Sequence, residues 1–478
     1  MTQGASARAA LEGAPMVRSS LLTLLCFALA ACPAPSNPDA GAVDAGPPLE
    51  LSGSRQGASL AVADFDGDGL ADKLVGAPFA SREGHRGVVL VYRGLPGGAF
   101  AFRPLALTGG DSFGATLVST GDLDGDGTAD YAIGATHGDG ETGLSGVVTL
   151  HRGGQRGAIL ATLAAGGPSA KFGFSIASGD FDADGHLDVA VGAPFDSPTP
   201  ALYQAGQVFL FFGPDFTRTH ALPASSTQKV IGWALAAGDL SGDGVADLVL
   251  GAAGKALAFH GKAGFAPTIS SPDLTVLSTA ANFSRSLTVL DDWSGDGIGE
   301  LVIGAPNSAA GAARDVGAFF VVKGAATTRV LDLGATPAPA DLLGTVKGAA
   351  TFDRLGAALA STGDLDGDGH RELLVSAPMS DAAINGLAGK VFLSKSGAPL
   401  ELTSATTFVG TERSGWFGAS LAPTADGKLF VGAPRAQSEA GAVQLLDLSS
   451  GQQVQSGSSG GATGAAGCHC DETGECHC

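Results

Sequence analysis

The chain has few residues that could cross-link it or catalyse a reaction. None of its six cysteines lies between Cys32 and Cys468, so no disulfide can stabilise that long segment. No Gly-x-Ser-x-Gly elbow, zinc-protease helix or phosphate-binding glycine loop is present, which leaves catalysis with little support. Lys and Arg number 27 against 47 Asp and Glu, a net charge of −20 that argues against a nucleic-acid partner.

The apolar run near the start is too short to span a bilayer as a mature helix. Arg18 precedes the run 21–29, and Leu29-Ala30-Ala31-Cys32 follows, which resembles a bacterial lipobox. We therefore expect a lipoprotein-type signal peptide over residues 1–31, with Cys32 as the lipidated N-terminus. The alternative is an ordinary signal peptide cut nearby. Translation could begin at Met1 or at Met16, since the signal has conventional proportions from Met16.

Residues 32–48 contain Pro, Ala, Gly and Asp with almost no large apolar side chains, so we expect a disordered tether. Pro33 stands where, by resemblance, an inner-membrane retention signal would carry Asp. This favours an exported lipoprotein of the outer membrane or cell surface, held to the membrane by its N-terminal lipid. The sequence does not fix which leaflet holds the anchor.

The segment Asp64-Phe65-Asp66-Gly67-Asp68-Gly69-Leu70-Ala71-Asp72 has the composition of a calcium loop. Ca²⁺ takes about 6 to 8 oxygen ligands, and carboxylates at alternate positions of a tight turn can converge on one ion. Asp64, Asp66, Asp68 and Asp72 would supply carboxylates, and Leu70 would supply its backbone carbonyl. An EF-hand is excluded, because its twelfth position needs an acid and here holds Val75, and the flanks are too short for helices.

The pattern returns five more times, with 58, 58, 59, 53 and 72 residues between the first aspartates. Six loops in register, each followed by an apolar strand, predict up to six Ca²⁺ sites. The ligands predicted in the five further loops are Asp122, Asp124, Asp126, Thr128 and Asp130; Asp180, Asp182, Asp184, His186 and Asp188; Asp239, Ser241, Asp243, Val245 and Asp247; Asp292, Ser294, Asp296, Ile298 and Glu300; and Asp364, Asp366, Asp368, His370 and Glu372. The residue at the seventh position of each loop would act through its backbone.

These loops account for the net acidity of the chain. They hold 22 of the 47 acidic side chains, which leaves 25 acids against 27 Lys and Arg. Carboxylates crowded in this way repel one another without a cation. We therefore expect calcium binding to stabilise the fold, with affinity in the extracellular range of about 10⁻⁴ to 10⁻³ M.

Each loop lies inside a larger unit. An apolar residue and a glycine open the unit, a short strand leads into the loop, and a second strand ends in Gly-Ala-Pro or a close variant. A third strand and an outer fourth strand follow, and four short strands in a unit of this length are typical of a propeller blade. The opening motifs are Gln56-Gly57, Phe113-Gly114, Phe172-Gly173, Ile231-Gly232, Phe283-Ser284, Leu355-Gly356 and Phe417-Gly418.

The order of opening Phe-Gly, acidic loop and closing Gly-Ala-Pro resembles the FG-GAP repeats of integrin α subunits. The resemblance implies an all-β, seven-bladed β-propeller of four-stranded antiparallel blades over residues 49–450. Pro48–Leu51 resembles Pro399–Leu402 ahead of the last unit, so we expect the N-terminal segment to close the ring as the outer strand of the last blade. Two departures stand out: the seventh unit has only Ala425-Asp426-Gly427-Lys428 in place of a loop, and Ser284 replaces a glycine.

A binding module is the function that this pattern favours. The loops of the face opposite the calcium loops are the more varied, for example 79–86, 136–141, 195–203 and 412–416, and such loops commonly hold partners. We expect a monomeric, non-enzymatic adhesion or ligand-binding module for an extracellular or envelope protein or glycan. The alternative is an envelope enzyme acting on a glycan or phospholipid on the same propeller.

Residues 451–478 begin as a Gly-rich, Ser-rich spacer and end in a cluster of cysteines and histidines. Cys468, Cys470, Cys476 and Cys478 could form a second metal site for Zn²⁺ or Cu(I). The alternative is a disulfide-linked or glutathione-capped tail, since an exported protein meets oxidising conditions.

Overall fold

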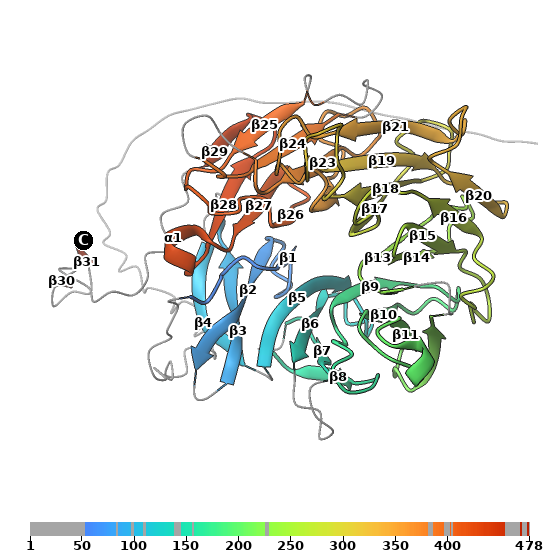
Figure 1. Cartoon of the computed structure of the whole chain (residues 1–478). Coiled ribbons are helices and arrows are strands. Elements are labelled where there is room, and N and C mark those ends of the chain that lie inside the picture. The colour runs from blue at the N-terminus through green and yellow to red at the C-terminus, as the bar shows by residue number, and fades with distance from the viewer. Residues whose placement is uncertain are drawn as a thin grey trace, which may run out of the picture. The chain divides into compact units, whose positions relative to one another are not determined.

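Antiparallel β-strands make up almost all of the described chain (Figure 1). The computed structural model describes residues 53–454 apart from 83–84, 97–99, 109–110, 138–144, 155–156, 225–228, 381–385, 396–401 and 403–404, and in addition 469–470 and 476–477. The predicted signal peptide, Cys32, the tether and Pro48–Leu51 lie outside these residues. None of the described helices has the length and apolar character needed to cross a membrane.

Successive strands pair in groups of four, each group running from an inner to an outer strand. The first group is β1 (Leu60–Ala63), β2 (Asp72–Arg82), β3 (His85–Gly94) and β4 (Phe100–Thr108), and the second is β5 (Asp111–Gly121), β6 (Asp130–His137), β7 (Val147–His151) and β8 (Ile159–Leu163). A single parallel pair, Gly87 with Phe113, joins these two groups into one eight-stranded sheet.

The later groups repeat this plan. They are β9 (Ser175–Gly179), β10 (Asp188–Ala193), β11 (Gln207–Phe212) and β12 (Arg218–Pro223); β13 (Leu235–Gly238), β14 (Asp247–Ala252), β15 (Lys255–Phe259) and β16 (Leu274–Leu277); β17 (Ser286–Leu290), β18 (Glu300–Ala305), β19 (Ala318–Lys323) and β21 (Leu342–Lys347); β22 (Leu359–Ser361), β23 (Leu373–Ala377), β24 (Lys390–Ser394) and β25 (Thr406–Val409); and β26 (Ser420–Pro423), β27 (Lys428–Ala433), β28 (Ala442–Asp447) and β29 (Gln452–Val454).

A few elements fall outside this plan. The 72-residue spacing between the fifth and sixth loops makes room for β20 (Arg329–Asp332), which adds to β16 as a parallel fifth strand. The 3₁₀ turn η2 (Pro200–Leu202) and the single helical turn α1 (Ala436–Glu439) lie in loops between second and third strands. In the tail, β30 (His469–Cys470) pairs with β31 (Cys476–His477), while Cys468 and Cys478 lie outside the described residues.

The outer strand of the last group differs from the one predicted. β29 pairs with β28 in the position predicted for Pro48–Leu51, which lie outside the described residues, and β29 extends past residue 450 to Val454. The physical reason is local: β28 and β29 are joined by a turn of only four residues, 448–451, and a short hairpin closes at a lower entropic cost than a pairing between chain ends.

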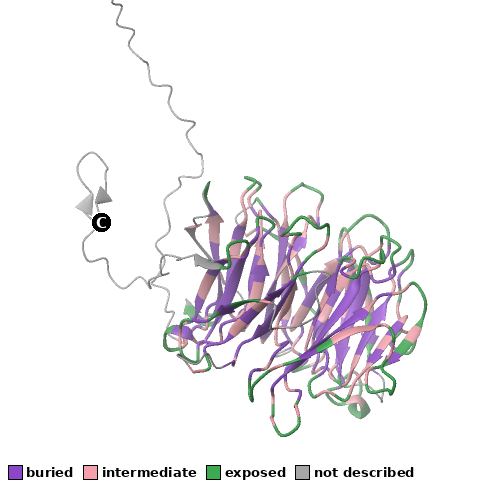
Figure 2. Ribbon diagram, turned by 90° about the horizontal axis from the view of Figure 1, so that it is seen from above, coloured by how far each residue is buried: buried purple, intermediate pink, exposed green. Residues whose placement is uncertain are grey.

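The second strand of each group is its most buried element. Every residue of β10, β14 and β18 is buried, which matches the Val, Leu, Ile, Ala and Gly residues that follow the acid at the start of each strand. The outer strands are more exposed: in β12 only Leu222 is buried. Figure 2 shows the same division, with buried residues along the strands and exposed residues in the connecting loops.

The hydrophobic core is divided into clusters between neighbouring groups. Leu74 of β2 and Ile133 of β6 share one such cluster, and the same arrangement recurs between each later pair of groups. The last group packs on the first in the same way: Phe430 of β27 and Leu445 of β28 lie in one buried cluster with Leu90 of β3. The inner strands also touch in succession, β1 with β5 and so on to β26, which contacts β1.

The opening and closing motifs interlock at each of these boundaries. In the first unit, the N–H of the opening residue Gly57 donates to the carbonyl of the closing residue Gly76 at 3.0 Å. The Ser59 hydroxyl donates to the carbonyl of Gly114, the opening glycine of the next unit, at 2.7 Å. A Cβ on Gly76 would overlap that same Gly114 oxygen, so the closing position needs glycine for close approach of two backbones.

The contact between the last and first groups uses the same parts. Ser420 donates to the carbonyl of Gly57 at 2.8 Å, and a Cβ on Gly432 would overlap that oxygen. The backbone N–H groups of Arg55 and Gln56 also donate to the carbonyls of Glu439 and Ala440, each at 3.0 Å. The boundary between the two ends of the described chain is therefore built like the internal ones.

A glycine substitution at this boundary should destabilise the whole fold. We expect Gly432→Ala to lower the free energy of unfolding by about 3 kcal/mol, because the new methyl group overlaps a backbone oxygen that is held in place. Gly363→Ala is the control, since a Cβ there meets nothing closer than 4.0 Å. Thermal or urea unfolding measures the difference. Equal stability of the two variants would contradict the packing of the last group on the first.

Candidate metal centres

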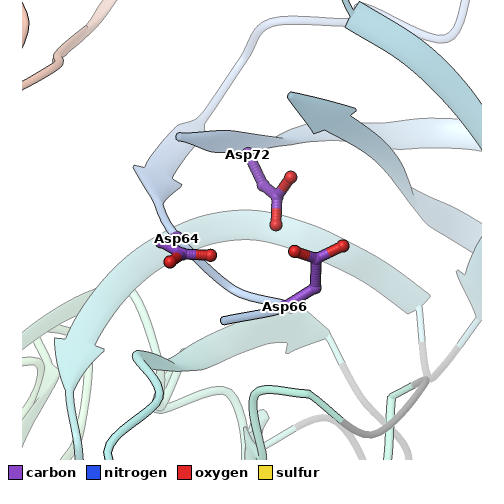
Figure 3. Close-up of side chains that lie close together, drawn as sticks. All are labelled: Asp64, Asp66 and Asp72. Carbon is purple, nitrogen blue, oxygen red and sulfur yellow. The ribbon is translucent and has the colours of Figure 1, made fainter. Parts of the chain in front are cut away.

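The acidic loops connect the first and second strands of their groups, where carboxylates converge. Asp64 and Asp66 lie in the turn after β1, and Asp72 begins β2; the three side chains point toward one another (Figure 3). In each of five loops, one oxygen from each of three acids lies within 4.8 Å of the other two. These groups are Asp64, Asp66 and Asp72; Asp122, Asp124 and Asp130; Asp180, Asp182 and Asp188; Asp292, Asp296 and Glu300; and Asp364, Asp366 and Glu372.

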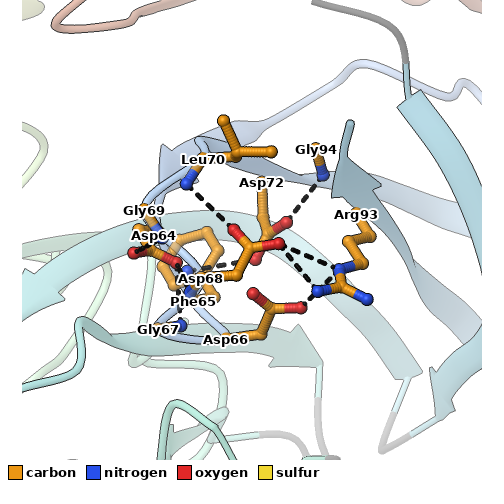
Figure 4. A network of polar contacts seen from close by, with 10 residues as sticks. All are labelled: Asp64, Phe65, Asp66, Gly67, Asp68, Gly69, Leu70, Asp72, Arg93 and Gly94. Carbon is orange, nitrogen blue, oxygen red and sulfur yellow. Dashed lines mark hydrogen bonds and ion pairs between the residues drawn. The ribbon is translucent and has the colours of Figure 1, made fainter. Parts of the chain in front are cut away.

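The first aspartate of the loop also shapes the turn. Asp64 accepts the backbone N–H groups of Gly67 at 2.8 Å, Asp68 at 3.1 Å and Gly69 at 2.7 Å (Figure 4). Gly67 and Gly69 have φ values of 76° and 84°, which glycine adopts at low cost. The loop therefore wraps around one carboxylate, and this explains why aspartate and two glycines recur at these positions.

The ninth position is the buried end of each site. Asp72 accepts the N–H of Phe65 at 3.1 Å and that of Gly94 at 2.7 Å, and thereby ties the loop to the end of the third strand. Burial raises the pKa of Asp72 to about 6, and it raises the pKa values of Asp188 and Asp247 to about 6 as well. A divalent cation would favour the ionised form that burial disfavours.

A glycine at the end of the third strand belongs to the site, and the sequence patterns did not identify it. Like Gly94, the residues Gly153, Gly213 and Gly261 donate their backbone N–H to the ninth-position aspartate of their unit, at 2.7, 2.9 and 2.8 Å. A Cβ on Gly94 would overlap the carbonyl of Ala71. The available signal was the recurrence of Arg-Gly or Lys-Gly after third strands, as in Arg93-Gly94 and Lys323-Gly324.

Buried carboxylate oxygens without a hydrogen bond show that the residues present fit a bound cation. Oδ1 of Asp182, Oδ1 of Asp292 and Oε1 of Glu300 are buried and accept no hydrogen bond from the described residues. A buried carboxylate oxygen without a hydrogen bond destabilises the fold unless a bound cation or another donor compensates it. Three converging carboxylates are hard oxygen donors, which suit Ca²⁺. In four of the five groups, the ion would be held by the acids at the first, third and ninth loop positions.

Basic side chains beside the loops were also missed by the sequence analysis. Nε of Arg93 lies 2.9 Å from Oδ2 of Asp66, and its Nη2 lies 2.7 Å from Oδ2 of Asp68. Four other loops have such a partner at the third or fifth position: Arg152 with Asp124, Arg218 with Asp182, Lys323 with Asp296 and Lys395 with Asp366. These cations reduce the repulsion within each acidic loop.

The fourth loop and the seventh unit differ from the rest. Asp239 and Asp247 make the usual loop hydrogen bonds, but the fourth loop has no converging group of three acids within the described residues. In the seventh unit the connection is the four-residue turn 424–427, where Asp426 pairs with Lys428 and accepts a hydrogen bond from Thr424. An internal ion pair stands where the other units have a loop.

The fifth and seventh loop positions are placed as follows. Asp68 and its counterparts accept the backbone N–H of the seventh-position residue, for example Leu70 at 2.9 Å, Thr128 at 2.9 Å and His186 at 2.9 Å. Their calcium contacts remain predictions, as does the second metal site at Cys468, Cys470, Cys476 and Cys478.

Comparison with known proteins agrees with this arrangement. Residues 56–92, 172–211, 231–264 and 355–393 match the FG-GAP repeat model. The chain is 37% identical over 153 residues to integrin alpha-4 of Xenopus laevis, which covers 30% of this chain and 14% of that protein. It is 39% identical over 177 residues to integrin alpha-7 of Rattus norvegicus, covering 34% and 15%. It is also 28% identical over 213 residues to phosphatidylinositol-glycan-specific phospholipase D of Mus musculus, covering 45% and 19%.

The fold and the loops define an all-β protein made of repeated four-strand units with acidic turns. The chain carries FG-GAP repeats and is similar to integrin α subunits, as the sequence predicted. It spans less than a fifth of the length of the relatives named above.

Chelation and pH should act on stability together. Burial raises the pKa values of Asp72, Asp188 and Asp247 to about 6 in the folded chain, above the ordinary value of about 4. At pH values between these two pKa values, the metal-free folded chain therefore binds more protons than the unfolded chain. Stability in EDTA should therefore fall as the pH rises from 5 to 7.5, by several degrees in melting temperature. Added Ca²⁺ should raise the melting temperature more at pH 7.5 than at pH 5. Identical melting with and without Ca²⁺ at both pH values would contradict the sites.

The basic residue beside the first loop should stabilise the metal-free fold and weaken calcium binding at that loop. We expect Arg93→Gln to lower the melting temperature in EDTA, because two carboxylates lose their counterion, and to tighten Ca²⁺ binding at that loop severalfold, because a competing cation is removed. Lys347→Gln, a charge-matched change at an exposed strand residue, should alter neither quantity. Calcium titration by calorimetry and thermal melting provide the two measurements. Weaker calcium binding in Arg93→Gln would contradict the competition.

Proposed function

We propose that the chain is a seven-bladed, calcium-binding β-propeller that acts as a ligand-binding or adhesion module on the surface of the cell. Three features support the closed ring: each core cluster lies between neighbouring groups, β26 contacts β1, and Ser420 binds the Gly57 carbonyl as Ser59 binds that of Gly114. β29 completes the last blade from the C-terminal side.

Calcium is the proposed ion at the loops. The observation that carries this assignment is the repeated convergence of three carboxylates with buried oxygens that have no hydrogen bond. Bound ions would join the loop, the second strand and the end of the third strand in each blade. The fourth loop, with fewer acids, would bind calcium more weakly.

The face opposite the calcium loops is the proposed ligand face. In an antiparallel group, loops between first and second strands lie at one edge, and loops between second and third strands lie at the other. That other edge carries exposed aromatic side chains: Phe79 is 54% exposed, Tyr203 is 67% exposed and Phe352 is 48% exposed. Exposed aromatic residues are enriched where proteins bind partners.

Export and a lipid anchor at Cys32 complete the proposal. They rest on the lipobox and on the tether composition of residues 32–48. The ligand would then be an extracellular or envelope protein or glycan, bound by a monomeric propeller. Zn²⁺ or Cu(I) binding by Cys468, Cys470, Cys476 and Cys478 remains a proposal on sequence alone.

The enzyme alternative has one specific observation in its favour, the partial similarity to a phospholipase D. That similarity covers 19% of the phospholipase. Within residues 53–454, gaps excepted, the converging groups of three or more acidic, histidine or cysteine side chains all lie in the acidic loops. The binding module is therefore the better-supported function.

A calcium-dependent binding screen tests the proposal. The full exported chain is applied to envelope glycans and matrix proteins in Ca²⁺ and in EDTA, and binding should occur in Ca²⁺ and decrease at least tenfold in EDTA. For a ligand found in this way, Tyr203→Ser or Phe352→Ser should weaken binding at least fivefold. Val330→Ser, at a 65% exposed position on the outer strand β20, should leave it unchanged. Hydrolysis of a glycan or phospholipid, or equal binding in EDTA, would contradict the proposal.

A further inference from the structure

The opening motifs of the third, fourth and fifth units differ from the others at one position. The residue after the opening glycine, or after Ser284 in the fifth unit, is Phe174, Trp233 and Arg285 in these three units. It is alanine in the other four: Ala58, Ala115, Ala357 and Ala419. A departure confined to neighbouring units of a repeat protein points to a local function rather than to the fold.

Two of these residues, Trp233 and Arg285, line a small cavity. Its volume is about 100 Å³, and it is lined by Val230, Trp233, Ala253, Asn282, Ser284 and Arg285. The cavity lies beside the closing end of β14 and the opening of the fifth unit, on the edge opposite the calcium loops. It can hold one small polar group but not a whole sugar or side chain.

Arg285 brings a positive charge that the described residues leave without an acidic partner. Its Cζ lies 3.3 Å from the centre of the Trp233 ring, and its Nη2 donates to Oδ1 of Asn282 at 3.3 Å. Its Nη1 is buried and donates to no described residue. Burial lowers the pKa of Arg285, and no neighbouring carboxylate offsets that effect.

The neighbours of Arg285 hold it in place. Nδ2 of Asn282 donates to Oδ1 of Asn307 at 2.6 Å, and Nδ2 of Asn307 donates to Asp315 at 3.1 Å. This chain of amides fixes the Asn282 oxygen toward the guanidinium. Trp233 is itself packed by Phe174, with ring centres 4.6 Å apart, and by Phe195, with ring centres 5.6 Å apart.

A carboxylate is the chemical group that suits this arrangement. A buried N–H of a guanidinium is costly without an acceptor, and arginine binds a planar carboxylate through two parallel hydrogen bonds. The aromatic side chains beside the cavity offer apolar faces for the carbon skeleton that carries such a group. The Asn282 amide, which lines the cavity, offers a further hydrogen bond for a hydroxyl group.

We propose that this cavity, the Arg285 pocket, binds the carboxylate of a uronic acid residue in an acidic glycan. The inference rests on the proposed ligand-binding function and names the class of ligand. Arg285 and Asn282 would hold the carboxylate, while Phe174, Phe195 and Trp233 would border the rest of the sugar.

The test uses a defined probe, an unsulfated oligosaccharide of alternating glucuronate and N-acetylglucosamine, with its carboxyl-reduced form as the neutral counterpart. Calorimetry on the full chain in Ca²⁺ should detect binding of the acidic form, and binding of the reduced form should be at least tenfold weaker. Arg285→Gln should weaken binding of the acidic form at least tenfold. Arg285→Lys keeps the charge but not the paired donors, so it should restore binding only in part. Lys262→Gln, which removes an exposed positive charge in the connection between β15 and β16, should have no effect.

Each outcome decides the assignment. Unchanged affinity in Arg285→Gln, or equal binding of the acidic and reduced forms, overturns the Arg285 pocket while leaving the ligand-binding function intact. The comparison of the two oligosaccharide forms needs no variant and decides the matter if Arg285→Gln does not fold. Arg285-dependent binding of an aspartate-containing peptide, without binding of the oligosaccharide, overturns the glycan assignment in favour of a protein ligand. Failure of the calcium-dependent screen with every ligand class overturns the proposed function itself.

Discussion

The structure depends on a backbone contact that is repeated between neighbouring four-strand groups. The carbonyl of an opening glycine, such as Gly114, lies against a closing glycine, Gly76, and accepts the hydroxyl of Ser59 from the preceding unit. Backbones can approach this closely only where no Cβ intervenes. The motif that the sequence repeats therefore forms the interface between groups, and the same contact between Ser420 and Gly57 links the last four-strand group to the first.

The boundary between the fourth and fifth units keeps a hydroxyl-to-carbonyl hydrogen bond in another way. The fourth unit has Ala234 where the first has Ser59. It therefore has no hydroxyl at this position to donate to the carbonyl of the next unit's opening residue. Ser284 replaces the opening glycine of the fifth unit, and its hydroxyl donates back to the carbonyl of Ala252 at 2.9 Å. The hydrogen bond across this boundary is kept with its donor on the other side. The substitution that looked like a defect in the sequence is thus a compensation, and it places Arg285 at the cavity beside it.

Hydrogen bonds and ion pairs within the chain stabilise the acidic loops. Backbone N–H groups of the loop donate to the carboxylate at the first position, and the glycine after the third strand donates to the carboxylate at the ninth position. Basic side chains such as Arg93 and Lys323 form ion pairs with other loop carboxylates and so offset the negative charge. This explains how a chain with a net charge of −20 can concentrate 22 acids in six turns. Calcium would act on a loop that is already shaped for it.

The sequence by itself determined the repeat, the strand order within each unit and the positions of the acidic loops, because each follows from residues within about ten positions of one another. It also predicted the family that the comparisons found. Only the tertiary structure decided which residues complete each site: Gly94 and Arg93 lie more than 20 residues beyond Asp72 and Asp66, and reach them because β2 and β3 pair. It also decided that β29 ends the last group, since a short hairpin turn brings it back beside β28 and no repeated motif marks this strand.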